Sequence, residues 1–364
     1  MAAIDQLPSG KWRVRWRRPD GKRGHKLFAR KTDARDFGKR IDADILRGNF
    51  IDPRSGEILF GKYAWEVMEG RLNIRPATRM RDESHLRKHI EPAFGHRPIG
   101  SIRKPEIKAW VRMLSEQKGL APRTVRECYR ILGSILREAV DDRLIADSPC
   151  QRVPLPRIEN KEKRFLTAQE VDRLAVAFDP RYRAIVYVGA YLGLRWGEIA
   201  GLKREHLKLH VVGRPAQIAV VGSLERIGNG WRYIEETKTV NSRRTLTVPV
   251  FLAQMLQEYL QQAPDSEFLF AAPEGGFLHY HNFVKRFWKP AVDTAGLAPL
   301  TIHELRHTCA ALLIKQGAGV LTIQKRLGHK DVRTTLGTYG HLFPEQDDVV
   351  LTALDLEFRQ ARSA

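Results

Sequence analysis

Two stretches rich in proline, glycine and charged residues divide this 364-residue chain into three parts. Residues 49–61 read NFIDPRSGEILFG, and residues 148–164 read SPCQRVPLPRIENKEKR. Neither stretch has the hydrophobic periodicity of a helix or a strand, so both are predicted to be linkers. Since a single hydrophobic core stops growing well below this length, we expect three domains. Their predicted bounds are residues 1–50, 60–147 and 165–364.

Apolar and cationic side chains alternate in the segment WRVRWR, residues 12–17. This period of two predicts a strand with one apolar face and one basic face. A turn at residues 19–21 leads to a second predicted strand at residues 25–30, and a helix is expected from Thr32 to Gly48. The basic face suits insertion into a DNA major groove, whereas a solvated accessory domain is the alternative. Its arginines are Arg13, Arg15 and Arg17.

The middle part reads as helical throughout, with breaks at residues 94–95 and 118–119. Basic side chains, Arg126 among them, punctuate each predicted helix. We expect a compact helical domain that grips DNA, and an ordinary helical bundle is the alternative. The predicted helices are residues 63–72, 78–89, 104–116 and 121–141.

The last part mixes helices with short strands. Thr167 and Glu170 have capping-box spacing and predict the start of its first helix. Strands are expected at residues 217–221, 231–235 and 244–249. The predicted helices are residues 184–194, 251–262, 281–295, 303–316 and 321–327. For the whole chain we expect a multidomain fold that is mainly α with small β-sheets.

The charge of the chain favours a polyanionic partner. Lys and Arg number 62 against 42 Asp and Glu, which gives a formal net charge of +20. Basic residues are in excess in every part, and cations that neutralise phosphates release condensed counterions. Three cysteines without C-x-x-C spacing and the absence of a secretion-signal pattern predict a reduced, cytoplasmic protein. The longest apolar run, residues 184–194, is too short to cross a bilayer.

Side chains suited to phosphodiester chemistry gather in residues 299–344 and at two upstream positions. Helical spacing places His303 and Arg306 on one face. The guanidinium of Arg306 fits two phosphate oxygens, and Arg195 is the candidate for the opposite side of the same phosphate. Two such cations would stabilise the charge that develops at phosphorus. Glu198 is predicted to orient Arg195.

Tyr339 is the predicted nucleophile. A phenol with a pKa of about 10 needs a base or surrounding positive charge at neutral pH, which His303 and His329 can supply. Lys238, between two predicted strands, is the candidate acid that protonates the departing 5′ oxygen. The product would be a 3′-phosphotyrosine, which stores the energy of the broken bond. No nucleotide and no metal is then required, and the expected cofactor is none.

These motifs resemble the tyrosine recombinase, or phage integrase, family. The resemblance covers residues 165–344 and rests on G-L-R-x-x-E at 193–198, a Lys in a predicted β-turn, H-x-x-R at 303–306, L-G-H at 327–329 and a Tyr ten residues later. It implies a site-specific integrase, similar to those of temperate phages and integrative elements, including actinobacterial ones. The family positions matched by this chain are Arg195, Lys238, His303, Arg306, His329 and Tyr339.

The resemblance also implies the roles of the other parts. Residues 1–50 are similar to an arm-site-binding domain, and residues 60–147 to a core-binding domain. Double-stranded attachment sites are the expected DNA partner, bound by a homo-tetramer on two duplexes, with DNA-bending and directionality proteins as further candidate partners. A helix at residues 347–358 could dock onto a neighbouring subunit or pack on its own domain. Arg243 and Arg244 are further candidates for phosphate contact.

Two other functions remain open from the sequence. The segment HELRH at residues 303–307 matches H-E-x-x-H, a helical zinc site of metalloproteases. Against a zinc site, Arg306 would lie beside a dication, and no glutamate lies between Glu304 and Glu345 as a third ligand. A non-catalytic DNA-binding regulator on the same fold could keep the arginines and lose Tyr339 or Lys238. This chain has the full set, and no metal is expected.

Overall fold

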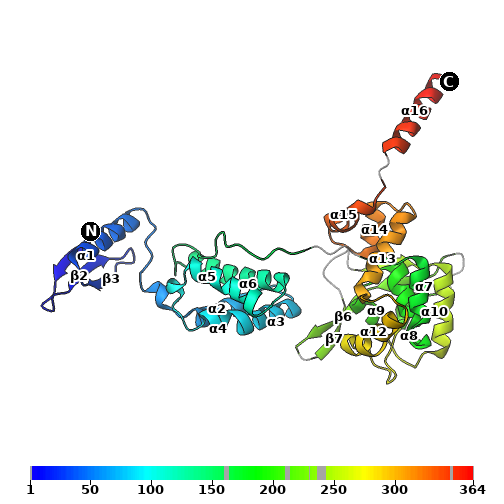
Figure 1. The fold of residues 1–364 in the computed structure, drawn as a ribbon, viewed down its shortest axis with the longest axis horizontal. Helices are drawn as coiled ribbons and strands as arrows, with labels where there is room; N and C mark the ends of the chain where they lie inside the picture. Colours follow the sequence, from blue (N-terminus) through cyan, green and yellow to red (C-terminus); the bar gives the residue numbers. More distant parts are fainter. Residues whose placement is uncertain are drawn as a thin grey trace. The chain divides into compact units, whose positions relative to one another are not determined.

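The computed structural model describes residues 2–159, 164–209, 214–228, 230–235, 243–344 and 347–363. These residues form a mainly helical protein with small antiparallel sheets, which confirms the expected fold class (Figure 1). The chain divides into two compact units, Met1–Asn160 and Lys161–Ala364. No helix among the described residues is long and apolar enough to cross a membrane.

The N-terminal part of the first unit is a sheet covered by one helix. The strands β1 (Ala3–Gln6), β2 (Trp12–Arg17) and β3 (Arg23–Phe28) pair in that order, and α1 (Lys31–Leu46) packs on them. Val14 and Trp16 are buried against this helix, as their alternation with arginines predicts. The strand β1 was not predicted, because AIDQ is short and mostly exposed.

A second core in the same unit is entirely helical. The helix α6 is amphipathic, and its apolar face, which includes Ile131 and Leu132, is buried in the centre of this core. The predicted helix at residues 78–89 is present but ends in a π-helical turn, η2. The elements are η1 (Ser55–Glu57), α2 (Phe60–Gly70), α3 (Pro76–His85), η2 (Leu86–Ile90), α4 (Glu91–Phe94), η3 (Ile99–Ser101), α5 (Lys104–Arg112), η4 (Met113–Gln117) and α6 (Pro122–Asp141).

The second unit begins with the predicted capping box. Thr167 accepts a hydrogen bond from the Glu170 amide, and α7 follows. The helices and helical turns are α7 (Ala168–Val176), α8 (Pro180–Tyr187), η5 (Val188–Leu192), α9 (Trp196–Ala200), η6 (Arg204–His206), α10 (Val250–Gln262), α11 (Tyr280–Phe283), η7 (Val284–Trp288), α12 (Lys289–Thr294), α13 (Ile302–Lys315), α14 (Val320–Leu327), α15 (Val332–Tyr339), η8 (Gly340–Leu342) and α16 (Asp347–Ser363).

Two small sheets lie in the same unit. One has the order β4-β5-β8, and the other is the hairpin β6-β7. The helix α13 packs against η5, and α14 packs against both α15 and β8. These contacts bring segments from residues 188–195 and 302–339 together. The strands are β4 (Leu207–Lys208), β5 (Gln217–Val220), β6 (Gly222–Ile227), β7 (Gly230–Glu235) and β8 (Arg244–Thr247).

Two glycines let helical segments end close to one another. Gly193 ends η5 with φ 70°, and Gly328 ends α14 with φ 65°, both in the left-handed region that favours glycine. A Cβ on Gly193 would lie 2.5 Å from Cδ2 of Leu327. A Cβ on Gly328 would lie 2.9 Å from a guanidinium nitrogen of Arg244. A side chain at either position would therefore be strained by the backbone conformation, and it would also displace the side chain of Leu327 or Arg244.

Candidate active site

Arg306 lies at the centre of the site. It projects from α13, its surface is 2% exposed, and its two terminal nitrogens donate to the carbonyls of Gly193 at 2.7 Å and Leu327 at 2.6 Å. These carbonyls lie at the ends of η5 and α14. Burial, followed by the charge of Arg195, lowers the pKa of Arg306 to about 10, so the group stays cationic at neutral pH.

Arg195 stands at the N-terminal end of α9 and shares a carboxylate with Arg244. Its side chain donates to Glu198 at 2.9 Å, which is the contact that the sequence predicts, and to the carbonyl of Gly328 at 3.4 Å. Arg244 donates to both carboxylate oxygens of Glu198, at 3.0 and 2.9 Å. Burial opposes ionisation of Glu198, but the hydrogen bonds and charge of Arg244, with those of Arg195, lower its pKa to about 2.

The position of Arg244 differs from the exposed position expected of a phosphate contact. Its side chain is 8% exposed, and its remaining donor binds the carbonyl of Arg326 at 2.9 Å. The guanidinium of Arg244 is therefore buried, whereas that of Arg195 is partly exposed. We assign Arg244 to holding Glu198, and through it Arg195. The sequence of β8 alone does not show that Arg244 faces the interior, because that depends on which elements pack against the strand.

His329 follows the glycine that ends α14. Its backbone N–H donates to Gln324, and its Nδ1 lies 2.9 Å from the hydroxyl of Thr335, which fixes the ring. Burial lowers the pKa of His329 to about 4, and the nearby charges of Arg306, Arg195, Arg244 and His303 act in the same direction. His329 is therefore neutral at physiological pH.

Tyr339 is buried at the end of α15, with 1% of its surface exposed. Its hydroxyl lies 2.7 Å from Nδ1 of His307, one turn after His303 on α13. Burial raises the pKa of Tyr339 to about 12, although the charges of Arg306 and Arg195 act to lower it. The phenol therefore needs a proton acceptor to act as a nucleophile at neutral pH.

The structure thus brings five of the six sequence-predicted catalytic residues close enough for their charges to affect one another's pKa values. They are Arg195, His303, Arg306, His329 and Tyr339. His303 is exposed and stacks edge-on against His307, with ring centroids 4.8 Å apart. Lys238 lies outside the described residues, between the end of β7 and the start of β8. His307, which is not among the six sequence-predicted catalytic residues, joins the site through Tyr339. The spacing of four residues from His303 is the signal that could have indicated it.

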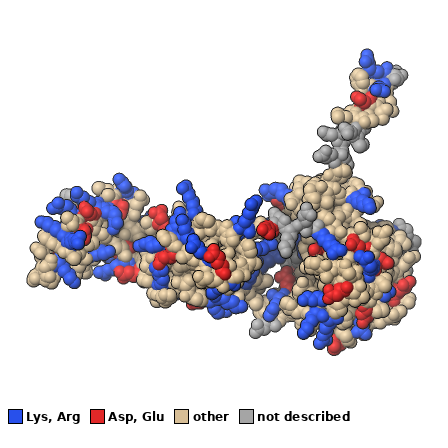
Figure 2. Space-filling model, viewed as in Figure 1, with Lys and Arg blue, Asp and Glu red and all other residues tan. Residues whose placement is uncertain are grey.

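The other candidate DNA contacts lie on exposed surfaces. Figure 2 shows many Lys and Arg side chains on the visible face of both units. A hollow of about 810 Å³ on the open face of the N-terminal sheet is lined by its three predicted arginines, two of which also pair with Asp5. Arg126 donates to the carbonyl of Pro156, and Arg243 pairs with Glu235. The three predicted arginines are Arg13, Arg15 and Arg17, and Arg23 also lines the hollow.

Replacing Glu198 by Gln should lower the free energy of unfolding near neutral pH by about 3–5 kcal/mol, the cost of breaking a buried ion pair. A carboxylate whose folded pKa is depressed stabilises the fold above its unfolded pKa, and this stability disappears as pH falls through the folded value. Between pH 4.5 and about 2 the native protein should therefore lose the part of its free energy of unfolding that ionised Glu198 contributes. The variant never has this contribution.

Denaturant unfolding of both proteins near pH 7 and near pH ~3 measures this difference. The exposed Glu258→Gln substitution on α10 is the matched control and should have little effect at either pH. An equal loss of stability for Glu198→Gln at both pH values would contradict the assigned ion pair.

Comparisons with known proteins show which family the chain resembles. Residues 164–346 match the phage integrase family, and residues 61–115 match its N-terminal SAM-like domain. The integrase of Mycobacterium phage D29 is 29% identical over 266 residues, 70% of this chain and 67% of that protein. The putative prophage phiRv2 integrase of Mycobacterium tuberculosis is 27% identical over 369 residues, 96% of this chain and 94% of that protein.

Solved structures show the same fold. The Tn1549 transposon integrase bound to circular-intermediate DNA has a TM-score of 0.70 at 20% identity, over 82% of this chain and 99% of that one. The lambda integrase tetramer bound to a Holliday junction has a TM-score of 0.60 at 18% identity, over 94% of both chains. With half of its length matched by the family domain, the chain belongs to the phage integrase family of tyrosine-type site-specific DNA recombinases.

Proposed function

We propose that Tyr339 is the nucleophile of this recombinase. Its phenolic oxygen attacks the scissile phosphorus, the bond from phosphorus to the 5′ oxygen breaks, and a 3′-phosphotyrosyl bond forms. Attack of a 5′ hydroxyl from another strand reverses these steps and reseals the DNA. Repeated on paired attachment sites, this exchange would integrate or excise phage or mobile-element DNA.

The observation that carries this proposal is the setting of the Tyr339 hydroxyl. It is hydrogen-bonded to His307 at 2.7 Å and lies in the field of the Arg306 and Arg195 charges. A phenolate that forms here is stabilised by those charges, and the same charges attract the phosphate that it attacks. A tyrosine that served only in packing would not require two guanidinium groups and an imidazole around its hydroxyl.

The two arginines are proposed to bind the non-bridging oxygens of the scissile phosphate. Arg195 is 45% exposed and is held by Glu198, so it can receive a phosphate without moving far. His303 is exposed on α13, three residues before Arg306, and can donate to the same phosphate. Neutral His329 can add a hydrogen bond without adding a charge. Together these groups stabilise the charge that builds at phosphorus.

Lys238 remains the proposed general acid. Its position in the sequence, between β7 and β8, places it shortly before a strand that borders the site, since β8 carries Arg244. An ammonium on such a connection can reach a DNA strand and protonate the 5′ oxygen as it leaves. His307 accepts the proton that the Tyr339 hydroxyl loses.

Replacing His307 by Ala should slow cleavage by about 100-fold, because general-base assistance contributes roughly that much or more. The Tyr339 hydroxyl would then lose the hydrogen-bond partner at 2.7 Å that holds it. His307→Gln, which can still hydrogen-bond but cannot accept a proton, separates positioning from proton transfer. Single-turnover cleavage rates across a range of pH are the measurement.

If His307 only positions Tyr339, the Gln variant should recover most of the rate and keep the native pH profile. If His307 accepts the proton, both variants should be slow and the pH profile should change. Native rates in both variants would remove His307 from the mechanism. His341→Ala provides a control, because His341 is an exposed histidine of the same unit.

Double-stranded attachment sites are the proposed partner, bound by a tetramer on two duplexes. The basic hollow on the N-terminal sheet supports arm-site binding, and the basic surface of the helical part supports core-site binding. The exposed apolar residues of α16 support docking onto a neighbouring subunit, because a soluble chain rarely leaves such a set uncovered. DNA-bending and directionality proteins are further proposed partners. The apolar residues are Leu351, Leu354, Leu356 and Phe358.

A nicked suicide substrate tests the proposal directly. Loss of the short fragment after cleavage prevents religation and traps the protein on DNA. Mass spectrometry of the trapped peptide should locate the phosphodeoxyribose remnant on Tyr339, and chelation by EDTA should not reduce the yield. An adduct on another residue would overturn the assignment, and tight DNA binding with no adduct would favour the non-catalytic regulator.

A further inference from the structure

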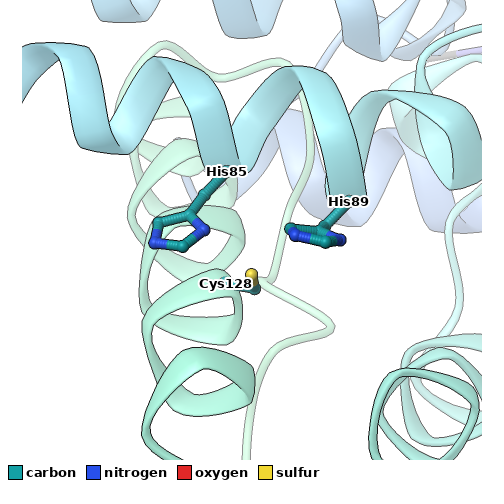
Figure 3. Close-up of side chains that lie close together, drawn as sticks. All are labelled: His85, His89 and Cys128. Carbon is teal, nitrogen blue, oxygen red and sulfur yellow. The ribbon is translucent and has the colours of Figure 1, made fainter. Parts of the chain in front are cut away.

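Two histidines and a cysteine meet inside the helical part of the first unit, away from the residues assigned to catalysis. His85 ends α3, His89 lies in the π-helical turn η2, and Cys128 comes from α6. Figure 3 shows the Cys128 sulfur directed toward the space between the two imidazole rings. One potential ligand atom from each residue lies within 4.8 Å of the other two.

His89 contributes a buried ring nitrogen that no protein group satisfies among the described residues. Its Nδ1 is buried and has no hydrogen-bond partner among the described residues, although buried ring nitrogens are normally satisfied. The neighbouring carboxylates are already engaged. Asp82 pairs with Arg130 and Arg71, and Glu127 pairs with Arg130, so neither is available to the imidazoles.

We propose that His85, His89 and Cys128 bind a divalent transition-metal ion, with Zn²⁺ as the preferred ion. Imidazole nitrogen and thiolate sulfur are the ligands that Zn²⁺ selects, whereas Mg²⁺ and Ca²⁺ prefer oxygen. A tetrahedral Zn²⁺ site places its ligand atoms roughly 3.5 Å apart, which follows from its metal–ligand bond lengths. Side-chain rotation of the half-buried histidines closes the remaining distance.

Binding of the ion would release the proton of the Cys128 thiol. Burial raises the pKa of the Cys128 thiol to about 11, so without metal the sulfur is protonated. The ion replaces that proton, forms a metal–sulfur bond and releases one H⁺ to solvent. Burial lowers the pKa of both histidines, which keeps them neutral and able to coordinate. With three protein ligands, water completes the tetrahedron.

The ion would tie two helices that carry the core of this unit. His85 and His89 belong to the α3–η2 segment, while Cys128 belongs to α6, and these segments are in contact. Binding to the folded protein alone stabilises the fold in proportion to the logarithm of metal concentration. The site is therefore structural, and DNA cleavage itself does not depend on it.

The test uses the full chain after treatment with a chelator. Co²⁺ reports a thiolate ligand through a sulfur-to-cobalt charge-transfer band, which histidines of the catalytic site cannot produce alone. One equivalent of Co²⁺ should give this band, and Zn²⁺ should abolish it and raise the Tm, whereas Mg²⁺ should do neither. Cys128→Ser should remove the band, and His85→Gln should weaken binding by at least about tenfold.

Cys150→Ser and His96→Gln are the matched controls, a cysteine and a histidine of the same unit outside the cluster. Both should keep the band and the Tm shift. If substitution of the buried Cys128 prevents folding, the partly exposed His85 still decides the question. Absence of the band in the native chain, or a band undiminished by His85→Gln, overturns the proposal.

Discussion

Tyr339→Phe is expected to abolish covalent attachment of the protein to DNA and to leave DNA binding near normal. The substitution removes one oxygen, the only atom of that side chain able to form a phosphodiester. The ring stays in place, because Tyr339 is 1% exposed and packs among Cys309, Ile323 and Leu327. The hydrogen bond to His307 is lost from the fold. Trapping on the nicked substrate measures the result.

Tyr280→Phe is a suitable control, since it removes a hydroxyl from a half-buried tyrosine elsewhere in the same unit. That variant should form adduct at the native rate. An adduct that persists in Tyr339→Phe would mean that the nucleophile is another residue. Loss of adduct together with loss of DNA binding would point instead to a damaged fold.

Arg306→Ala is expected to reduce the cleavage rate by roughly three orders of magnitude, as loss of a positioned transition-state donor commonly does. The same guanidinium also ties Gly193 to Leu327, so part of the loss comes from the fold. Arg306→Lys separates the two effects, because an ammonium keeps the charge but cannot donate to both carbonyls in one plane. Thermal unfolding of each variant should accompany the rate measurements.

If phosphate binding dominates, Arg306→Lys should keep more activity than Arg306→Ala at a similar Tm. If the hydrogen bonds of Arg306 to the carbonyls of Gly193 and Leu327 matter most, Tm and activity should fall together in both variants. Arg333→Ala is the control, because that side chain is 88% exposed and pairs only locally with Asp331. Cleavage by Arg306→Ala at the native rate would refute the proposed binding of the scissile phosphate by Arg306.

Local patterns in the sequence predicted most of the fold. The alternation in β2, the capping box before α7 and the amphipathic face of α6 are each present in the structure. The helix expected to begin at Thr32 instead begins one residue earlier, at Lys31, and its N-terminus has no side-chain cap. Short exposed strands such as β1 have too little pattern to predict. The proposed domain bounds remain predictions.

The candidate site shows where sequence reasoning ends. Motif spacing predicted Arg195, His303 and Arg306, because each lies within one helix or at its start. The pairing of His307 with Tyr339 joins residues 32 positions apart, and this contact between α13 and α15 has no local signature. Arg244 of β8 likewise meets Glu198 of α9 only through a tertiary contact, 46 positions apart.

The hydrogen bonds that hold the two arginines before DNA arrives have an energetic consequence. Arg195 is bound to Glu198, and Arg306 is fixed between two carbonyls. Ordering a long side chain at an interface costs about 0.5–1.5 kcal/mol of conformational entropy. Folding has already ordered these two, so that cost is not subtracted from the binding of the scissile phosphate.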